Sequence, residues 1–236
     1  MRERPISVVP RPVLLLLALA FTLQLGWHLL HPAPVPRAED LEPPPPLAAL
    51  QVASFGEQIG LGKLLMLYVQ AFDNQPGLQL PFAQLDYERL QAWLGSVLAL
   101  DPRGQYPLLS ASRLYADVAD PAKKRQMLEF VYTRFFDDPA RRWPSLAHAA
   151  IIAKHQLKDL PLARKYAQAI RERTQGMDVP AWASQMEIFI LEDMNELDSA
   201  KILIGGLLQS GQIDDPNERR FLAERLKDMD RPRSEQ

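Results

Sequence analysis

The sequence predicts an all-α protein in which one membrane-spanning helix precedes a body of paired helices. An uncharged apolar run occupies residues 13–30, and apolar residues recur at helical spacing after residue 47. In addition, a phrase that opens at an alanine and closes at a proline recurs in the second half of the chain. Its copies are residues 122–139, 163–180 and 200–216, with a fainter copy at 85–102. Self-similarity with a period of roughly 35–45 residues is typical of stacked helical hairpins.

Composition limits the classes of protein to consider. The chain has 236 residues, of which 47% are hydrophobic, so it can bury one sizeable core. The net charge of −2 gives no electrostatic reason to expect nucleic acid as a partner. The absence of cysteine excludes disulfides, thiolate zinc sites and a cysteine nucleophile.

The first 30 residues predict a signal anchor. Residues 1–12 carry Arg2, Arg4 and Arg11 against Glu3, and the apolar run at 13–30 approaches the roughly 20 residues that cross a bilayer core. Basic residues before the run and acidic residues after it favour a cytoplasmic N-terminus. The expected location is therefore the bacterial inner membrane, with a single pass and a periplasmic C-terminal domain.

A cleaved signal peptide is the alternative interpretation of this segment. Residues 18–20 (Ala-Leu-Ala) form a possible small-residue cleavage site. However, only a short apolar run precedes that site, and a further apolar stretch follows it. These two features favour the uncleaved anchor.

A proline-rich linker is expected at residues 31–46, where seven prolines and three acidic residues exclude a helix interior. Polyproline II, at about 3 Å per residue, would make it a semi-rigid spacer. The helical body is expected at residues 47–230, and a disordered tail at 231–236.

Each repeated phrase predicts one helix, and the segments between the phrases predict partner helices. The expected partners lie at residues 55–72, 106–118, 144–156 and 181–195. A last amphipathic helix at 217–229 has a charged outer face suited to capping a stack. Asp-Pro pairs mark several boundaries, because proline disfavours helical geometry in the preceding residue and aspartate can cap a following helix. Arg141 and Arg142, just before Trp143, are expected in a solvated turn.

The body resembles a divergent tetratricopeptide-repeat domain. In that family a small residue opens the second helix of each hairpin, an apolar residue follows about four positions later, and a proline ends the unit. The matching residues are Ala163, Ala167, Ile170, Ala200, Ile204 and Leu207. The family's first-helix pattern is absent, and the closing prolines (102, 139, 180 and 216) are spaced more widely than the usual 34 or so residues.

The resemblance implies a right-handed solenoid of helical hairpins whose first helices line a concave groove. Such a groove would bind another protein or a peptide, here one from the envelope or inner membrane. The candidate groove residues are His148, Ile152, His155, Gln185, Phe189 and Glu192. The implied function is an adaptor or scaffold that serves an assembly, secretion or maturation complex.

Motifs that carry chemistry are weak in this chain. Residues 56–63 depart from a phosphate-binding loop, because the glycine spacing is wrong, Leu64 replaces the required Ser or Thr, and no strand is predicted before it. His148 and His155 are too far apart for an ordinary i, i+4 metal pair. No serine lies in a nucleophile-elbow context. We therefore expect no catalytic residue, no metal and no cofactor.

A structural or haem-binding subunit of a membrane complex is the alternative to the scaffold. His28 and His31, at the edge of the apolar run, are the residues that would bind haem. Interfacial anchoring is the better explanation of these histidines.

Overall fold

The computed structural model describes residues 9–31, 38–75, 77–210, 213 and 215–230. The expected tail at 231–236, residues 32–37 of the expected linker and residues 1–8 of the expected N-terminal segment lie outside these residues. The chain divides into two units, Met1–Ala38 with Pro76–Leu78 and Glu39–Gln75 with Gln79–Gln236. The second unit is called the body below.

The first unit contains α1 (Arg11–Leu30), a helix of 20 residues with a mean hydropathy of 2.0. None of its residues is buried. Pro12, in the first turn, suits a helix start because the missing N–H would have no intrahelical partner there. By length and composition α1 can cross a membrane, as the apolar run predicted.

The body is helical almost throughout in the residues described. Its helices are α2 (Leu47–Ala53), α3 (Gln58–Ala71), α4 (Tyr87–Leu100), α5 (Tyr106–Ser110), α6 (Pro121–Phe135), α7 (Pro139–His155), α8 (Leu160–Arg173), α9 (Ala181–Asp193), α10 (Leu197–Gln209) and α11 (Pro216–Asp230). A π-helical turn, η3 (Ala111–Tyr115), continues α5. Two short strands, β1 (Asn74–Gln75) and β2 (Leu78–Gln79), and a 3₁₀ turn, η2 (Phe82–Gln84), lie between α3 and α4.

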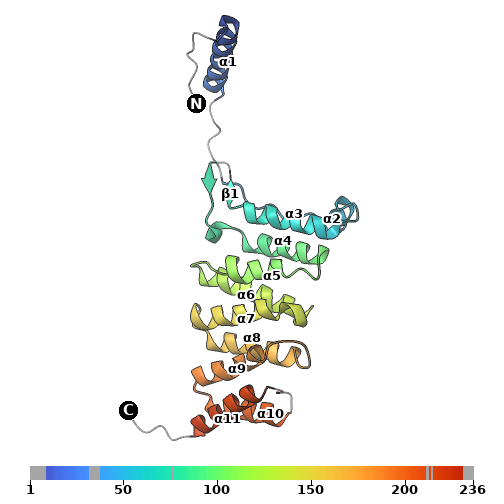
Figure 1. Ribbon diagram of the computed structural model, residues 1–236, viewed down its shortest axis with the longest axis vertical. Coiled ribbons are helices and arrows are strands. Elements are labelled where there is room, and N and C mark those ends of the chain that lie inside the picture. The colour runs from blue at the N-terminus through green and yellow to red at the C-terminus, as the bar shows by residue number, and fades with distance from the viewer. Residues whose placement is uncertain (1–8, 32–37, 76, 211–212, 214, 231–236) are drawn as a thin grey trace, which may run out of the picture. The chain divides into compact units, whose positions relative to one another are not determined.

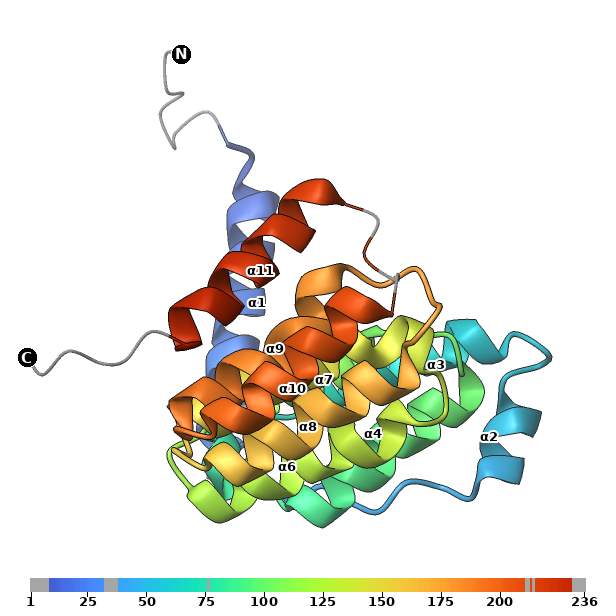
Figure 2. The ribbon, with the colours of Figure 1, turned by 90° about the horizontal axis from the view of Figure 1, so that it is seen from below.

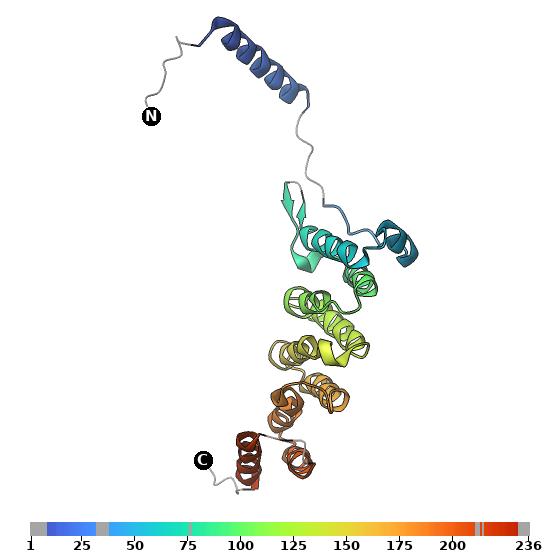
Figure 3. The same cartoon turned by 45° about the vertical axis from the view of Figure 1, so that its right-hand side comes forward.

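Helices of the body pack against their neighbours in sequence. Pairs in contact include α3 with α4, α6 with α7, and each successive pair from α7 to α11 (Figure 1 and Figure 3). Most of the connections are short, so paired neighbours run antiparallel. One core cluster extends from Leu41 to Ile190, and a second, smaller cluster joins Ile188 of α9 with α10 and with Leu222 of α11.

The alanines of the repeated phrase lie where helices approach one another. Ala163, Ala167 and Ala200 are fully buried, as are Ile170 and Ile204. The equivalent Ala122 of α6, in contrast, is exposed. The small residue is therefore used for close packing in α8 and α10 but not in α6.

Contacts between the proline-rich segment and the body begin at Glu39. The Glu39 N–H donates to Gln75 Oε1 (2.9 Å), Arg89 Nη1 to the Leu41 carbonyl (2.9 Å) and Trp93 Nε1 to the Glu42 carbonyl (2.7 Å). Leu41 itself is buried. The proline content placed the start of the body at residue 47, whereas these contacts begin eight residues earlier.

Every helix expected in the body overlaps an observed one, but the start of α7 differs. The helix begins at Pro139, not at Pro144, which lies inside it. The expectation of a solvated turn at Arg141 and Arg142 is wrong, because both are helical and Arg142 is almost fully buried. Its Nη1 donates to Asp137 Oδ2 (2.7 Å) and to the Arg134 carbonyl, and its Nη2 donates to the Pro102 carbonyl (3.1 Å).

We expect Arg142→Ala to lower the free energy of unfolding by about 2–3 kcal/mol, because it removes a buried set of three hydrogen bonds and leaves the Pro102 carbonyl without its donor. Arg141→Ala is the matched control, since Arg141 forms an exposed pair with Asp138 whose loss should cost less than about 1 kcal/mol. Urea unfolding of the detergent-solubilised chain, followed by helical circular dichroism, measures both. Equal losses would show that Arg142 does not hold the start of α7.

Candidate binding groove between α7 and α9

The helices α7 and α9 lie side by side and run in the same direction. Near their starts, the rings of Trp143 and Trp182 meet edge to face with centroids 5.3 Å apart. At their ends, Lys154 forms an ion pair with Asp193. Two matched contacts therefore fix the register of α7 against α9.

A hollow of about 160 Å³ opens between these two contacts. It is lined by Ala150, Ile151, Lys154, His155, Met186, Phe189 and Ile190. Ile151 is 44% exposed, and Trp182 near one end is 51% exposed. The walls of this α7–α9 hollow are mainly apolar, and charged side chains lie at one end.

Of the six residues predicted to line a groove, His155 and Phe189 line the α7–α9 hollow. Ile152 does not, because it faces the core and is buried. His148 is half-buried and lies near the charged groups of Arg113 and Asp117, at the side of α7 nearer η3. The structure thus places the two histidines in different surroundings.

The other predicted positions on α9 contact α11, the helix that ends the described body. Gln185 donates to Glu218, and Arg225 Nε donates to Glu192 Oε1 (2.9 Å). The Arg225 guanidinium also lies 5.3 Å from the centre of the Phe189 ring. The chain's own α11 therefore covers part of the predicted binding surface. The sequence offered one indication of this contact between α9 and α11: Glu218 and Arg225 have the same seven-residue spacing as Gln185 and Glu192.

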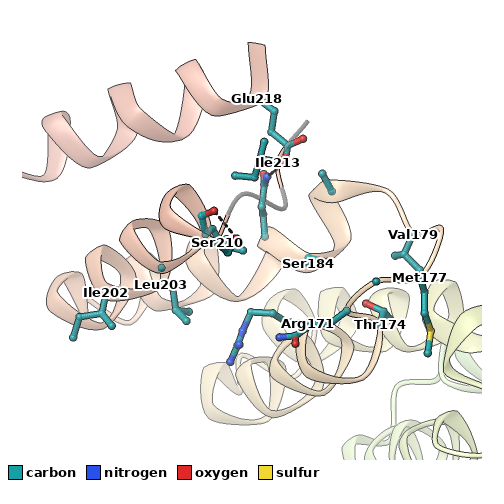
Figure 4. Close-up of a pocket in the computed structure, with 16 residues that line it drawn as sticks. Arg171, Thr174, Met177, Val179, Ser184, Ile202, Leu203, Ser210, Ile213 and Glu218 are labelled. Atoms are coloured by element: carbon teal, nitrogen blue, oxygen red, sulfur yellow. Dashed lines mark hydrogen bonds between the residues drawn. The ribbon is translucent and has the colours of Figure 1, made fainter. Parts of the chain in front are cut away.

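A larger cavity of about 550 Å³ lies among the end of α8, α9, α10 and the start of α11 (Figure 4). Several of its polar groups bond to protein partners: Arg171 Nε donates to Glu187 (2.8 Å), Thr174 Oγ1 donates to the Ile170 carbonyl (2.8 Å), and Gln185 donates to Glu218. Gly206 leaves space there, since no atom lies within 4 Å of where its Cβ would be. The sequence signal for this cavity was the glycine pair inside a helix.

Comparison with family models, with curated proteins and with solved structures finds no match to this chain. Within the described residues, no group of three or more His, Asp or Glu side chains is placed to hold a metal ion. The geometry defines an all-helical protein with one helix able to span a membrane.

The surroundings of His148 predict how this residue affects the pH dependence of folding stability. Burial, and then the positive charge of Arg113, hold the pKa of His148 below its ordinary value, while Asp117 acts in the opposite direction. The folded state therefore binds this proton more weakly than the unfolded chain does. The associated stability is present above a pH of about 6.5 and is lost as the pH falls through the lowered folded-state pKa.

We expect His148→Gln to reduce the fall in melting temperature that the wild type shows between about pH 7 and pH 5. Thermal unfolding followed by circular dichroism measures this fall. His155→Gln, the same substitution at an exposed position of the same helix, is the matched control. An unchanged pH dependence in His148→Gln would contradict the assignment.

The contacts of Arg225 predict how firmly α11 is held. Arg225→Ala removes the pair with Glu192 and the contact with Phe189, together about 1 kcal/mol at this partly exposed site. Amide exchange in α11 should accelerate about fivefold while exchange in α8 stays constant. Arg220→Ala should leave α11 protected, because the Arg220 guanidinium donates to Asn217 of the same helix. Unaltered protection in Arg225→Ala would show that the apolar contacts alone hold α11.

Proposed function

We propose that this chain is a membrane-anchored protein-interaction scaffold that faces the bacterial periplasm. Its body is a divergent tetratricopeptide-like stack of helical hairpins, and α1 anchors it in the inner membrane with the N-terminus in the cytoplasm. It serves an envelope assembly, secretion or maturation complex as an accessory factor. It binds its partner through surface complementarity and is not an enzyme.

The observation that carries this proposal is the α7–α9 hollow. Ile151 and Phe189 offer an apolar surface on two helices whose register is fixed by the Trp143–Trp182 and Lys154–Asp193 contacts. An apolar site on rigid elements binds at little conformational cost, since few groups have to be ordered when the partner arrives. Such a site fits a large apolar side chain of a peptide.

The polar residues at the end of the α7–α9 hollow indicate which kind of partner segment it suits. Lys154 and His155 lie at the end of the hollow, where Lys154 already pairs with Asp193. A partner segment with an apolar anchor residue and a neighbouring polar or charged residue suits this arrangement. The mode of binding is a helix or an extended segment laid along the α7–α9 seam.

Two further observations support the repeat architecture and the anchor. Consecutive packing from α7 to α11 is the arrangement that stacked hairpins require, and α11 presents charged residues as a terminal helix of a stack does. The basic residues before α1 and the acidic residues after it support the proposed orientation.

Site-specific crosslinking in the native membrane tests the proposal. A photoreactive phenylalanine analogue at Ile151 should crosslink one protein of the envelope, and the same analogue at Thr133, an exposed position on α6, should not. Trp182→Ala should reduce the Ile151 crosslink, because it removes an exposed aromatic ring at one end of the hollow.

Three outcomes would overturn the proposal. Equal crosslinking from Ile151 and Thr133, or none from either, would exclude the hollow as the binding surface. An absorption spectrum of the purified chain with a stoichiometric Soret band would instead identify a haem-binding subunit.

A further inference from the structure

The start of the body carries an apolar surface that the scaffold function does not use. Seven of the fourteen exposed large apolar side chains described after α1 lie between residues 47 and 68. They are Leu47, Val52, Phe55, Ile59, Leu64, Leu67 and Tyr68. We call this set the α2–α3 apolar surface.

On α3 the exposed face is a continuous stripe. Gly60, Leu64, Leu67 and Ala71 follow the i, i+4, i+7, i+11 spacing of one helix face, and all four are exposed. The opposite face packs on α4, where Gly62 lies close to Leu100 and Val97. Lys63 is the only charged residue in α3. The exposed stripe therefore has almost no charge to keep it in water.

The two ends of the helical body differ in this respect. A stack of helices needs a polar outer face at each end to remain soluble. Helix α11 meets this need with exposed charged residues such as Arg219, Glu224 and Lys227. Helix α3, in contrast, exposes Leu64 (64%) and Leu67 (61%). The start of the body has the composition of a covered surface.

A turn between α2 and α3 holds a phenylalanine outward. Phe55 is 96% exposed and has a φ of 48°, an uncommon backbone conformation for a bulky residue. Ser54 stabilises this turn: it is buried, its Oγ donates to the Gln51 carbonyl (2.7 Å), and its own carbonyl accepts from the Glu57 N–H (2.8 Å). Helix α2, which carries Val52, projects beyond α3 (Figure 2 and Figure 3). The backbone therefore presents Phe55 and Val52 to whatever covers this surface.

The short segment between α1 and the body indicates what covers the α2–α3 apolar surface. The first residues fixed to the body are Glu39, Leu41 and Glu42, bound by Gln75, Arg89 and Trp93 at the α3–α4 end. Only residues 31–38 separate that attachment from the end of α1. Eight residues extend at most about 29 Å, so an anchored α1 keeps the α3–α4 end of the body near the bilayer surface.

We infer that the α2–α3 apolar surface docks on the bilayer, at the boundary between headgroups and acyl chains. This inference rests on the membrane anchoring proposed above. Phe55, Leu64 and Leu67 enter the apolar side of the boundary, while Tyr68 and Lys63 lie at the headgroup level, where aromatic and cationic side chains are favoured. The short tether raises the local concentration of lipid, so this weakly charged face needs little intrinsic affinity.

The proposed docking surface and the α7–α9 hollow lie on different helices. The docked helices are the first of the body, and the hollow is built by later ones. Membrane contact and partner binding therefore use different helices, and both can occur together.

The absence of cysteine allows a direct test by single-cysteine labelling. The full chain, one copy per lipid nanodisc of mixed zwitterionic and anionic lipid, carries an environment-sensitive fluorophore at Gly60→Cys. No side chain crowds this site, since only Glu57 Cβ lies within 4 Å of the position of a Cβ. Nitroxide-labelled lipids should quench this probe severalfold more than a probe at Glu224→Cys on α11. Leu64→Gln with Leu67→Gln should abolish the excess quenching, and Ile202→Gln, at another exposed apolar residue, should not.

A probe at Phe21→Cys, within α1, separates the two proposals. Strong lipid quenching at position 21 with none at position 60 would overturn the docking and leave the anchor intact. No quenching at position 21 would overturn the anchor, and the docking with it. Emission at position 60 that responds to a second copy per nanodisc, and not to nitroxide lipid, would show that the surface is a dimer interface and would overturn the lipid assignment.

Discussion

Burial of each helix's apolar face against the helix next in sequence is the constraint on which the body depends. Ala163, Ala167 and Ala200 allow the backbones of α8 and α10 to approach their neighbours, and Ile170 and Ile204 fill the space beside them. Because this burial is mostly between neighbours in sequence, a helix inside the body packs against others on two sides, and a helix at either end of the described body packs on one side. The side chains on the outer sides of these end helices therefore differ in character from those between helices.

Much of the fold could be predicted from the sequence, because a helix with one buried face repeats its apolar residues at helical spacing. The apolar spacing of α4, α6, α8 and α10 and the aspartates before α6 and α11 located most elements. The start of α7 could not be predicted, because the buried Arg142 donates its hydrogen bonds to Asp137 and to the carbonyl groups of Arg134 and Pro102. Such a site depends on tertiary contacts that no local pattern records.

The candidate site was predicted less completely than the fold, for a geometric reason. Helical spacing places His148, Ile152 and His155 along one side of α7, but small rotations about the helix axis decide which of them faces solvent. Ile152 faces the core, while the neighbouring Ile151 lines the hollow. Likewise, the sequence placed Gln185 and Glu192 on one side of α9 without showing that α11 would meet them.

The division of the apolar core into two clusters has a consequence for the dynamics of the chain. Among the described residues, the second cluster contains six buried side chains, from Ile188 to Leu222, whereas the first extends from Leu41 to Ile190. Cooperative opening units follow the extent of shared burial, so we expect α10 and α11 to open more readily than the helices that share the first cluster. Opening of α11 would uncover Gln185, Glu192 and the face of the Phe189 ring that Arg225 contacts. The part of α9 that a partner can reach would therefore depend on how often α11 opens.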